Sequence, residues 1–104
     1  MIMKKIIGGR KYNTETATEI AVYENDFGRS DFKYMIETLY KKKTGEFFLY
    51  GEGGPMSKYA AEAYGGGRTS GEAIVPLTEA ETKKWAEEHM DVDAYEELFG
   101  EVEE

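Results

Sequence analysis

The chain has 104 residues, of which 40% are hydrophobic, and it includes eight Tyr, five Phe and one Trp. This length predicts a single domain over residues 1–104, and the apolar content excludes an intrinsically disordered chain. Because there is no Cys, a disulfide framework, a thiolate zinc site and a thiol nucleophile are excluded. No apolar run reaches the roughly 20 residues that span a bilayer, and the N-terminal run is too short for a signal peptide. We therefore expect a protein of the cytoplasm that does not associate with a membrane.

The charge is concentrated at the C-terminal end. The formal net charge is −8, yet residues 79–104 alone carry eleven acids and two lysines, a net charge of −9. Residues 1–78 carry eleven bases and ten acids, a net charge of +1. An acidic helical segment of this density projects a negative field that attracts basic partners and repels the phosphates of nucleic acids. The charge pattern therefore indicates a class of partner, and it indicates no reaction.

The N-terminal quarter is expected to form a β-hairpin followed by a short helix. Residues 4–12 are typical of two strands around a Gly-Gly pair, which tolerates the positive φ of a tight turn. Apolar residues at helical spacing then predict a short helix with its N-cap at Asn13 or Thr14. The apolar face of that helix would consist of Ala17, Ile20 and Ala21. A strand is expected to begin at Val22.

The clearest element is a central β-hairpin over residues 31–51. Within residues 32–41, aromatic and β-branched residues alternate with other residues at period two, which is typical of a strand. Apolar residues occur on both faces, and this predicts a strand in the middle of a sheet. The turn is expected at residues 43–45, with Gly45 in a left-handed conformation, and the return strand at residues 46–50.

Residues 56–77 contain a glycine-rich segment between two predicted elements. Ser57 is expected to cap a short helix that reaches Tyr64, and residues 65–71 are expected to form a flexible loop. Residues 72–77 are then expected to form a strand. Pro76 favours an edge position for this strand because proline cannot donate to a hydrogen-bond ladder.

Two helices are predicted at the C-terminal end. Thr78 and Glu81 form a capping box, and an apolar face follows at helical spacing. This face consists of Thr82, Trp85, Ala86, His89 and Met90. Asp91 or Asp93 is expected to cap the second helix, which ends at Gly100. Its apolar stripe consists of Val92, Tyr95, Leu98 and Phe99.

Together these elements predict an α+β fold, a small antiparallel sheet with a central β-hairpin and two C-terminal helices packed on it. The acidic helical part comprises residues 78–100, and residues 101–104 are expected to fray. An exposed apolar strand edge would allow a homodimer.

No residue pattern supports catalysis or metal binding. His89 is the sole histidine and is expected to pack on the apolar helix face, and nothing links Ser57 or Ser70 to it. The glycine runs lack the Gly-Lys-Ser/Thr order of a nucleotide-binding loop. Asp91 and Asp93 are spaced like the start of a calcium loop, but no glycine follows at the sixth position. We therefore predict a non-enzymatic protein without a cofactor or a bound metal.

Two charged surfaces remain as candidate binding sites. The first is acidic, and the residues expected to contact a basic partner are Glu87, Glu88, Asp91, Asp93, Glu96 and Glu97. The second is basic and consists of Lys41, Lys42 and Lys43 at the tip of the central hairpin. Aromatic residues near these lysines could stack on RNA bases. For RNA to bind there, the acidic end would have to face away.

Three blocks of the sequence resemble small accessory proteins carried by phages and conjugative elements of Gram-positive bacteria. They are KYNTETA at residues 11–17, ETLY through KTGEFFLYGEGGP within residues 37–55, and PLT through WAEEH within residues 76–89. Small acidic proteins of such elements include type II anti-CRISPR proteins, some of which occupy the basic nucleic-acid channels of Cas9. The resemblance implies a bacterial host cytoplasm and a binding function, and it supplies no catalytic residue.

The sequence therefore leads to two hypotheses. In the first, the protein is an inhibitor whose acidic helices bind a basic nucleic-acid-binding protein, and the resemblance implies Cas9, either guide-free or guide-bound. In the alternative, the protein is an RNA-binding or regulatory module that uses the basic, aromatic hairpin at residues 31–51. Direct binding of RNA at low salt separates the two, because the first hypothesis does not expect it.

Overall fold

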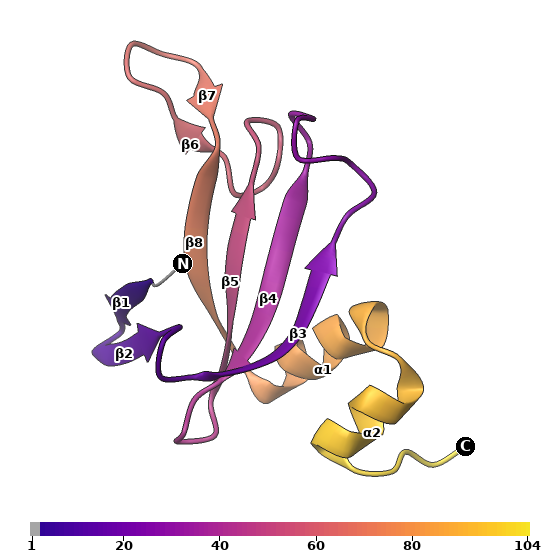
Figure 1. Ribbon diagram of the computed structural model, residues 1–104. Helices are drawn as coiled ribbons and strands as arrows, with labels where there is room; N and C mark the ends of the chain where they lie inside the picture. Colours follow the sequence, from indigo (N-terminus) through magenta and orange to yellow (C-terminus); the bar gives the residue numbers. More distant parts are fainter. Residues whose placement is uncertain (1–2) are drawn as a thin grey trace.

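The computed structural model describes residues 3–104 and has an α+β fold built on a four-stranded antiparallel sheet (Figure 1). The sheet has the order β3-β4-β5-β8, made by β3 (Thr18–Glu24), β4 (Met35–Lys41), β5 (Phe47–Gly53) and β8 (Gly71–Leu77). A hairpin of β1 (Lys4–Ile7) and β2 (Arg10–Asn13) precedes it. The short pair β6 (Ala61–Glu62) and β7 (Arg68–Thr69) projects past the sheet (Figure 1). The chain closes with α1 (Glu79–His89) and α2 (Val92–Phe99).

The central hairpin forms the middle of the sheet, as the alternation of residues predicts. β4 pairs with β3 on one side and with β5 on the other, so neither of its edges faces solvent. Both faces of such a strand are covered, which explains the apolar residues on both faces. The turn holds Gly45 at a φ of 94°, a region that glycine adopts without steric cost. β8 lies at the edge of the sheet, where Pro76 is tolerated.

The side of the sheet that faces the helices carries the larger hydrophobic core. Its buried residues are Leu39, Phe47, Leu49 and Trp85. Leu98 and Phe99 of α2 pack against them, and the Phe47 and Phe99 rings lie 5.9 Å apart. Burial of these apolar side chains against the sheet fixes both helices at one end of it.

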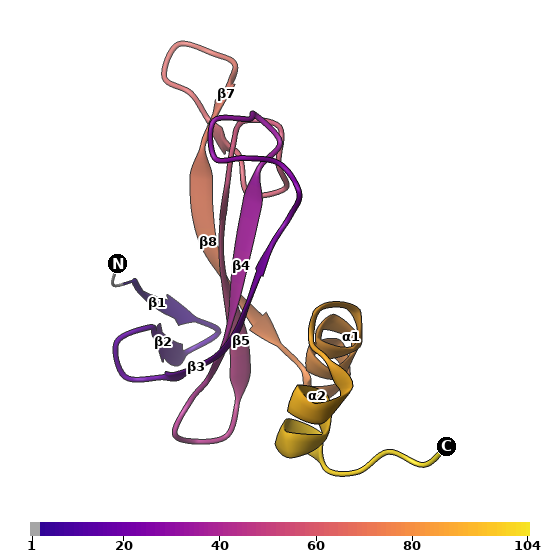
Figure 2. The same ribbon diagram turned by 45° about the vertical axis from the view of Figure 1, so that its right-hand side comes forward.

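The opposite side of the sheet carries a second core beneath the β1–β2 hairpin. Tyr12, Phe48 and Ile74 are buried there, and the Tyr12 ring meets the Phe48 ring edge-on at 5.5 Å. Met3 and Ile7 of the hairpin pack against this cluster. Figure 2 shows the β1–β2 hairpin on one side of the sheet and both helices on the other. The molecule therefore has three layers, with the sheet in the middle.

The helix boundaries follow the predicted caps. The Thr78 side chain accepts a hydrogen bond from the backbone N–H of Glu81, and the Glu81 carboxylate accepts one from the backbone N–H of Thr78. Asp91, rather than Asp93, caps α2 by accepting the N–H of Ala94 at 2.8 Å. Gly100 has a φ of 92° immediately after the last turn of α2.

The apolar face of α1 was predicted more accurately than that of α2. Thr82, Trp85 and Ala86 are buried in α1, as expected. In α2 the predicted stripe is wrong at its start, because the Val92 side chain is 71% exposed. α2 approaches the core only with its last turn, at Leu98 and Phe99.

The helix predicted after Asn13 does not form. The Asn13 side chain accepts the N–H of Glu15 at 2.9 Å, which closes a turn, and the strand β3 begins at Thr18. Its β-branched residues at 18, 20 and 22 favour a strand, and pairing with β4 satisfies backbone groups that a short helix would leave open. Helical spacing over three apolar residues was too short a signal to decide against this pairing.

The helix predicted from Ser57 to Tyr64 is also wrong. The Ser57 hydroxyl accepts the N–H of Tyr59 at 3.2 Å, but it does so in a turn, and β6 follows at once. An eight-residue helix is marginal by itself, whereas the turn buries the Tyr59 ring.

The start of β4 was predicted three residues too early. The strand was expected to begin at Phe32, but Phe32 lies in a loop and is 64% exposed, and β4 begins at Met35.

Candidate functional site

All six acids predicted to contact a partner lie in the helical layer. Their positions are Glu87 and Glu88 on α1, Asp91 at the cap of α2, and Asp93, Glu96 and Glu97 on α2. Five of them are exposed, and Glu96 is half-buried. These six acids thus lie on one side of the sheet, away from the β1–β2 hairpin (Figure 2).

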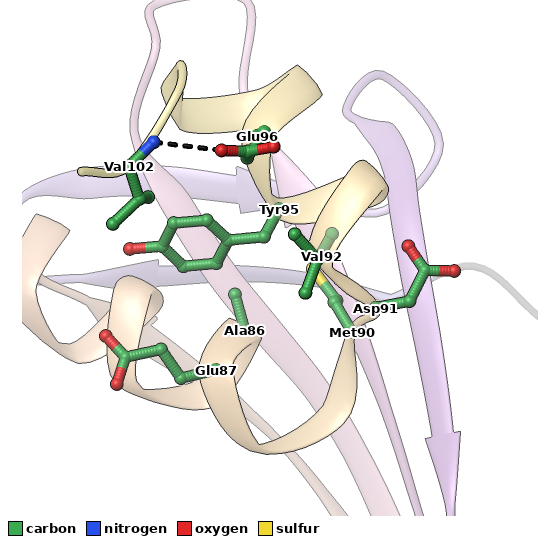
Figure 3. Close-up of a pocket in the computed structure, with 8 residues that line it drawn as sticks. All are labelled: Ala86, Glu87, Met90, Asp91, Val92, Tyr95, Glu96 and Val102. Atoms are coloured by element: carbon green, nitrogen blue, oxygen red, sulfur yellow. Dashed lines mark hydrogen bonds between the residues drawn. The ribbon is translucent and has the colours of Figure 1, made fainter. Parts of the chain in front are cut away.

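Three of these acids line one hollow of about 350 Å³ between α1 and α2. They are Glu87, Asp91 and Glu96. The remaining lining is apolar or aromatic and consists of Ala86, Met90, Val92, Tyr95 and Val102. Figure 3 shows the Tyr95 ring between Val92 and Val102, with the carboxylates of Glu87 and Asp91 on opposite sides of it in this view. The hollow therefore combines an apolar floor with an acidic rim.

Two of the carboxylates around the hollow also hold local structure. Asp91 is the N-cap of α2, and a carboxylate oxygen of Glu96 accepts the N–H of Val102 at 2.9 Å (Figure 3). That hydrogen bond brings the segment after α2 back to the hollow. Within residues 3–104, the side chains of Glu87, Asp93 and Glu97 make no hydrogen bond or ion pair, so their charges are available to a partner.

Glu88 belongs to a different part of the surface. It lines a second hollow of about 540 Å³ on the other flank of α1, together with Trp85, Lys84 and the loop residues Lys58 and Tyr59. Its carboxylate also lies 3.8 Å from Nε2 of His89. The six predicted acids therefore share one layer, but they do not share one hollow.

A buried carboxylate beneath the helices was not singled out by the sequence analysis. The Glu37 side chain, on β4, is only 2% exposed. It accepts hydrogen bonds from the Tyr59 hydroxyl and from Nε1 of Trp85, the latter at 3.0 Å, and Nζ of Lys58 lies 2.9 Å from it. Each carboxylate oxygen is thereby satisfied, as a buried charge requires.

These contacts change the ionisation of the two central groups. Burial raises the pKa of Glu37, but the hydrogen bonds from Tyr59, Lys58 and Trp85 lower it by more, so this pKa lies below the ordinary value of 4.5. The pKa of the Tyr59 hydroxyl is raised by burial and by its hydrogen bond to the Glu37 carboxylate. Glu37 is therefore a carboxylate, and Tyr59 a neutral hydroxyl, at neutral pH. The arrangement stabilises charge in place and supplies no group poised to transfer a proton.

Gly51 makes room for this cluster. It pairs with Glu37 across β4 and β5, and a Cβ atom placed on it would lie 1.9 Å from Cζ of Tyr59. The Tyr59 ring therefore lies over a position where the sheet has no side chain. The sequence did contain a signal for this cluster, because Glu37 lies between the apolar residues Met35 and Leu39 on one face of a predicted strand. That Glu37 is paired with Gly51 is visible only from the register of the two strands.

The hairpin lysines do not form one surface. The Nζ of Lys42 lies 3.1 Å from the Glu46 carboxylate and 4.3 Å from the centre of the Tyr12 ring, on the side of β1–β2. Lys41 is one residue away and lies over the ring of Phe47, on the side of the helices. Phe47 and Phe48 are buried, so neither ring can stack on a base. The structure therefore does not bring the three lysines and these aromatic rings together as a stacking platform.

His89 packs as the sequence predicts. Its ring stacks on Tyr23 of β3 at 3.8 Å between centroids and meets the Trp85 ring at 4.9 Å. The Ser57 hydroxyl donates to the Gly54 carbonyl at 2.8 Å, in a loop at the other end of the sheet (Figure 1). In residues 3–104, no group of three or more acidic or histidine side chains is arranged to hold a metal ion.

None of the helices in residues 3–104 has the length and apolar character needed to cross a membrane. No protein-family model matches the chain, and no curated protein and no solved structure matches it. A fold alone does not determine a function, which depends on the chemistry of the surfaces that the fold presents.

Proposed function

We propose that this protein is a non-enzymatic binding protein whose acidic helical layer engages the basic surface of a nucleic-acid-binding protein. The observation that carries the proposal is the position of Glu87, Asp91 and Glu96 around one apolar hollow. Acids that serve only to keep a helix soluble have no reason to surround apolar side chains. Their position around the hollow therefore supports a binding role.

The hollow has the chemistry to accept an arginine or lysine side chain. The aliphatic stem of such a residue would cover Tyr95 and Val92, and its charged head would reach the carboxylates on the rim. Arginine fits best, because its planar guanidinium stacks on an aromatic face and donates to carboxylates in pairs. A partner with arginines exposed in a nucleic-acid groove offers this side chain repeatedly.

The charge of the whole helical layer would add to that contact. Residues 79–104 carry a net charge of −9. Such a field speeds association with a positive surface, and salt screens it over about 8 Å at physiological ionic strength. Binding should therefore weaken as salt concentration rises, chiefly through a slower association rate.

Cas9 is the first partner to test, on the resemblance to proteins of Gram-positive mobile elements. In the proposal the acidic layer occupies a Lys/Arg-lined channel that otherwise holds guide RNA or target DNA. The test is a pull-down of purified Cas9 with and without guide RNA, followed by a cleavage assay in which the protein is added before or after the guide. Binding to guide-free Cas9 and loss of cleavage only on early addition would identify guide loading as the blocked step. Binding to neither form would reject Cas9 as the partner.

A further inference from the structure

The layer opposite the helices carries the reverse charge. The β1–β2 hairpin with the turn after it (residues 3–17) and the turn between β4 and β5 (residues 42–46) contain six bases and two acids, a net charge of +4. The bases are Lys4, Lys5, Arg10, Lys11, Lys42 and Lys43. We call this set the basic hairpin surface. The prediction from the sequence named Lys41, Lys42 and Lys43, of which only the last two belong to this surface, because the contact between these two segments is not visible in the sequence.

Specific contacts join the two segments. The Glu46 carboxylate lies 2.5 Å from Nη1 of Arg10 and 3.1 Å from Nζ of Lys42, so one acid holds a base from each segment. Lys42 also lies over the ring of Tyr12, which is itself packed edge-on against Phe48. The basic hairpin surface is therefore held on the sheet by its own ion pairs and by a buried aromatic cluster.

Three lysines from the two segments converge on one hollow of about 180 Å³. Lys11 comes from β2, and Lys42 and Lys43 come from the β4–β5 turn. Asn13, Thr16, Ala17 and Thr44 complete its lining. Lys11 and Lys43 are exposed and form no ion pair within residues 3–104. The unpaired ammonium groups of Lys11 and Lys43 can therefore each bind a phosphate oxygen as a point charge.

We propose that the basic hairpin surface binds the phosphate backbone of a double-stranded nucleic acid without reading its sequence. Charge complementarity identifies the occupant as a polyanion, since the surface carries +4 on a chain whose net charge is −8. Backbone binding fits better than base stacking, because the rings beneath the surface, Tyr12 and Phe48, are buried.

The acidic helices do not prevent this binding. The β1–β2 hairpin, which supplies four of the six bases, lies on the other face of the sheet from the helices (Figure 2). The β4–β5 turn lies nearer to the helices, since Gly45 and Glu46 line one hollow with Glu79 and Phe99. Salt screens charges over about 8 Å at physiological ionic strength, which limits the repulsion of a phosphate backbone by the acids of the far layer. This second surface goes beyond the proposed function, and it departs from the expectation that the protein makes no direct contact with nucleic acid. The two surfaces are independent, so either proposal can fail without the other.

The test is fluorescence anisotropy with a labelled duplex of DNA and one of RNA, measured over a series of salt concentrations. If about four lysines or arginines contact phosphates, the logarithm of the binding constant falls with the logarithm of salt concentration at a slope of about −3 to −4. The double variant Lys11→Gln/Lys43→Gln should bind about tenfold more weakly at low salt and reduce the slope by about 2. The matched control Lys33→Gln/Lys84→Gln makes the same charge change outside the surface and should leave binding and slope unchanged.

Several results would overturn the proposal. They are absence of duplex binding at low salt, equal losses in the two double variants, and binding to single strands but not to duplexes. A second copy of the protein could also bind the basic hairpin surface, because its acidic helices carry the opposite charge. Analytical sedimentation of the protein alone measures this self-association. Salt-sensitive self-association that Lys11→Gln/Lys43→Gln abolishes, without duplex binding, would assign the surface to a dimer instead.

Discussion

Trp85 of α1 donates its indole N–H to the carboxylate of Glu37 at the centre of the sheet, across 3.0 Å. The two residues are 48 positions apart in the chain. This hydrogen bond ties the acidic helical layer to the sheet at a fixed point, because both side chains are buried and the Glu37 carboxylate is also held by Tyr59 and Lys58. The geometry of the surface that we propose for partner binding therefore depends on a charge inside the fold.

Replacing Glu37 with Gln should destabilise the protein by about 2–3 kcal/mol, because charge-assisted hydrogen bonds from Tyr59 and Trp85 become neutral or mismatched. Chemical denaturation near neutral pH measures this free energy of unfolding. Glu24→Gln, on the exposed edge strand β3, is the matched control and should cost about 0.5 kcal/mol or less. Equal stabilities of the two variants would show that Glu37 is not a stabilising charge.

Acid should remove the advantage of Glu37. Its pKa in the folded state lies below the ordinary value of 4.5, so the folded protein binds this proton less readily than the unfolded chain does. The stabilisation is therefore complete above the unfolded pKa and is lost as the pH falls through the lower, folded value. The difference in unfolding free energy between wild type and Glu37→Gln should be constant between about pH 5.5 and pH 7 and shrink below about pH 4. A difference that grows in acid would contradict the direction of the pKa shift.

Gly51 should not tolerate a side chain. In Gly51→Ala the new Cβ would overlap the Tyr59 ring, which must then leave its position over the sheet and release Glu37. We expect a loss of about 3 kcal/mol, combining overpacking with a broken hydrogen bond. Gly28→Ala is the control, since its added Cβ would meet no atom within 4 Å. A thermal shift for Gly51→Ala no larger than that of the control would mean that Tyr59 does not occupy this position.

Thr78 should contribute as a helix cap. Thr78→Ala removes the oxygen that accepts the Glu81 N–H and should cost about 1 kcal/mol, measured by denaturation. Thr69→Ala, in the exposed strand β7, removes the same atoms without a cap and should be nearly neutral. The Glu81 carboxylate also accepts a hydrogen bond from the backbone N–H of Thr78, and this bond remains in Thr78→Ala. A loss of unfolding free energy close to that of Thr69→Ala would mean that this second hydrogen bond is sufficient to stabilise the start of α1.

The sequence was most informative where short-range chemistry determines the structure. Both helices, their caps and the central hairpin follow from local patterns, namely the Thr78–Glu81 spacing, Asp91, Gly100 and the alternation before Gly45. These features are decided within a few residues of each other, so they can be predicted without the fold.

The sequence was least informative where distant pairing determines the structure. The two helices predicted at residues 13–21 and 57–64 were wrong, since pairing of β3 with β4 and burial of Tyr59 prevailed over weak local propensities. The hollow between α1 and α2 and the basic hairpin surface also depend on packing between segments, and composition alone showed only that charge was present.

The most direct test of the account compares guide-free Cas9 binding by three forms of the protein at increasing salt. The first is wild type, and the second carries Glu87→Lys, Glu88→Lys, Asp93→Lys and Glu97→Lys, which spare the capping residue Asp91 and the Glu96 hydrogen bond. The third makes the same charge change at exposed acids outside the helical layer, through Glu15→Lys, Glu24→Lys, Asp26→Lys and Glu62→Lys. We predict that the helical reversal weakens binding about tenfold or more while the matched reversal stays within about threefold of wild type. Equal binding by the two reversed forms, or by wild type and the helical reversal, would contradict a role for the acidic helices.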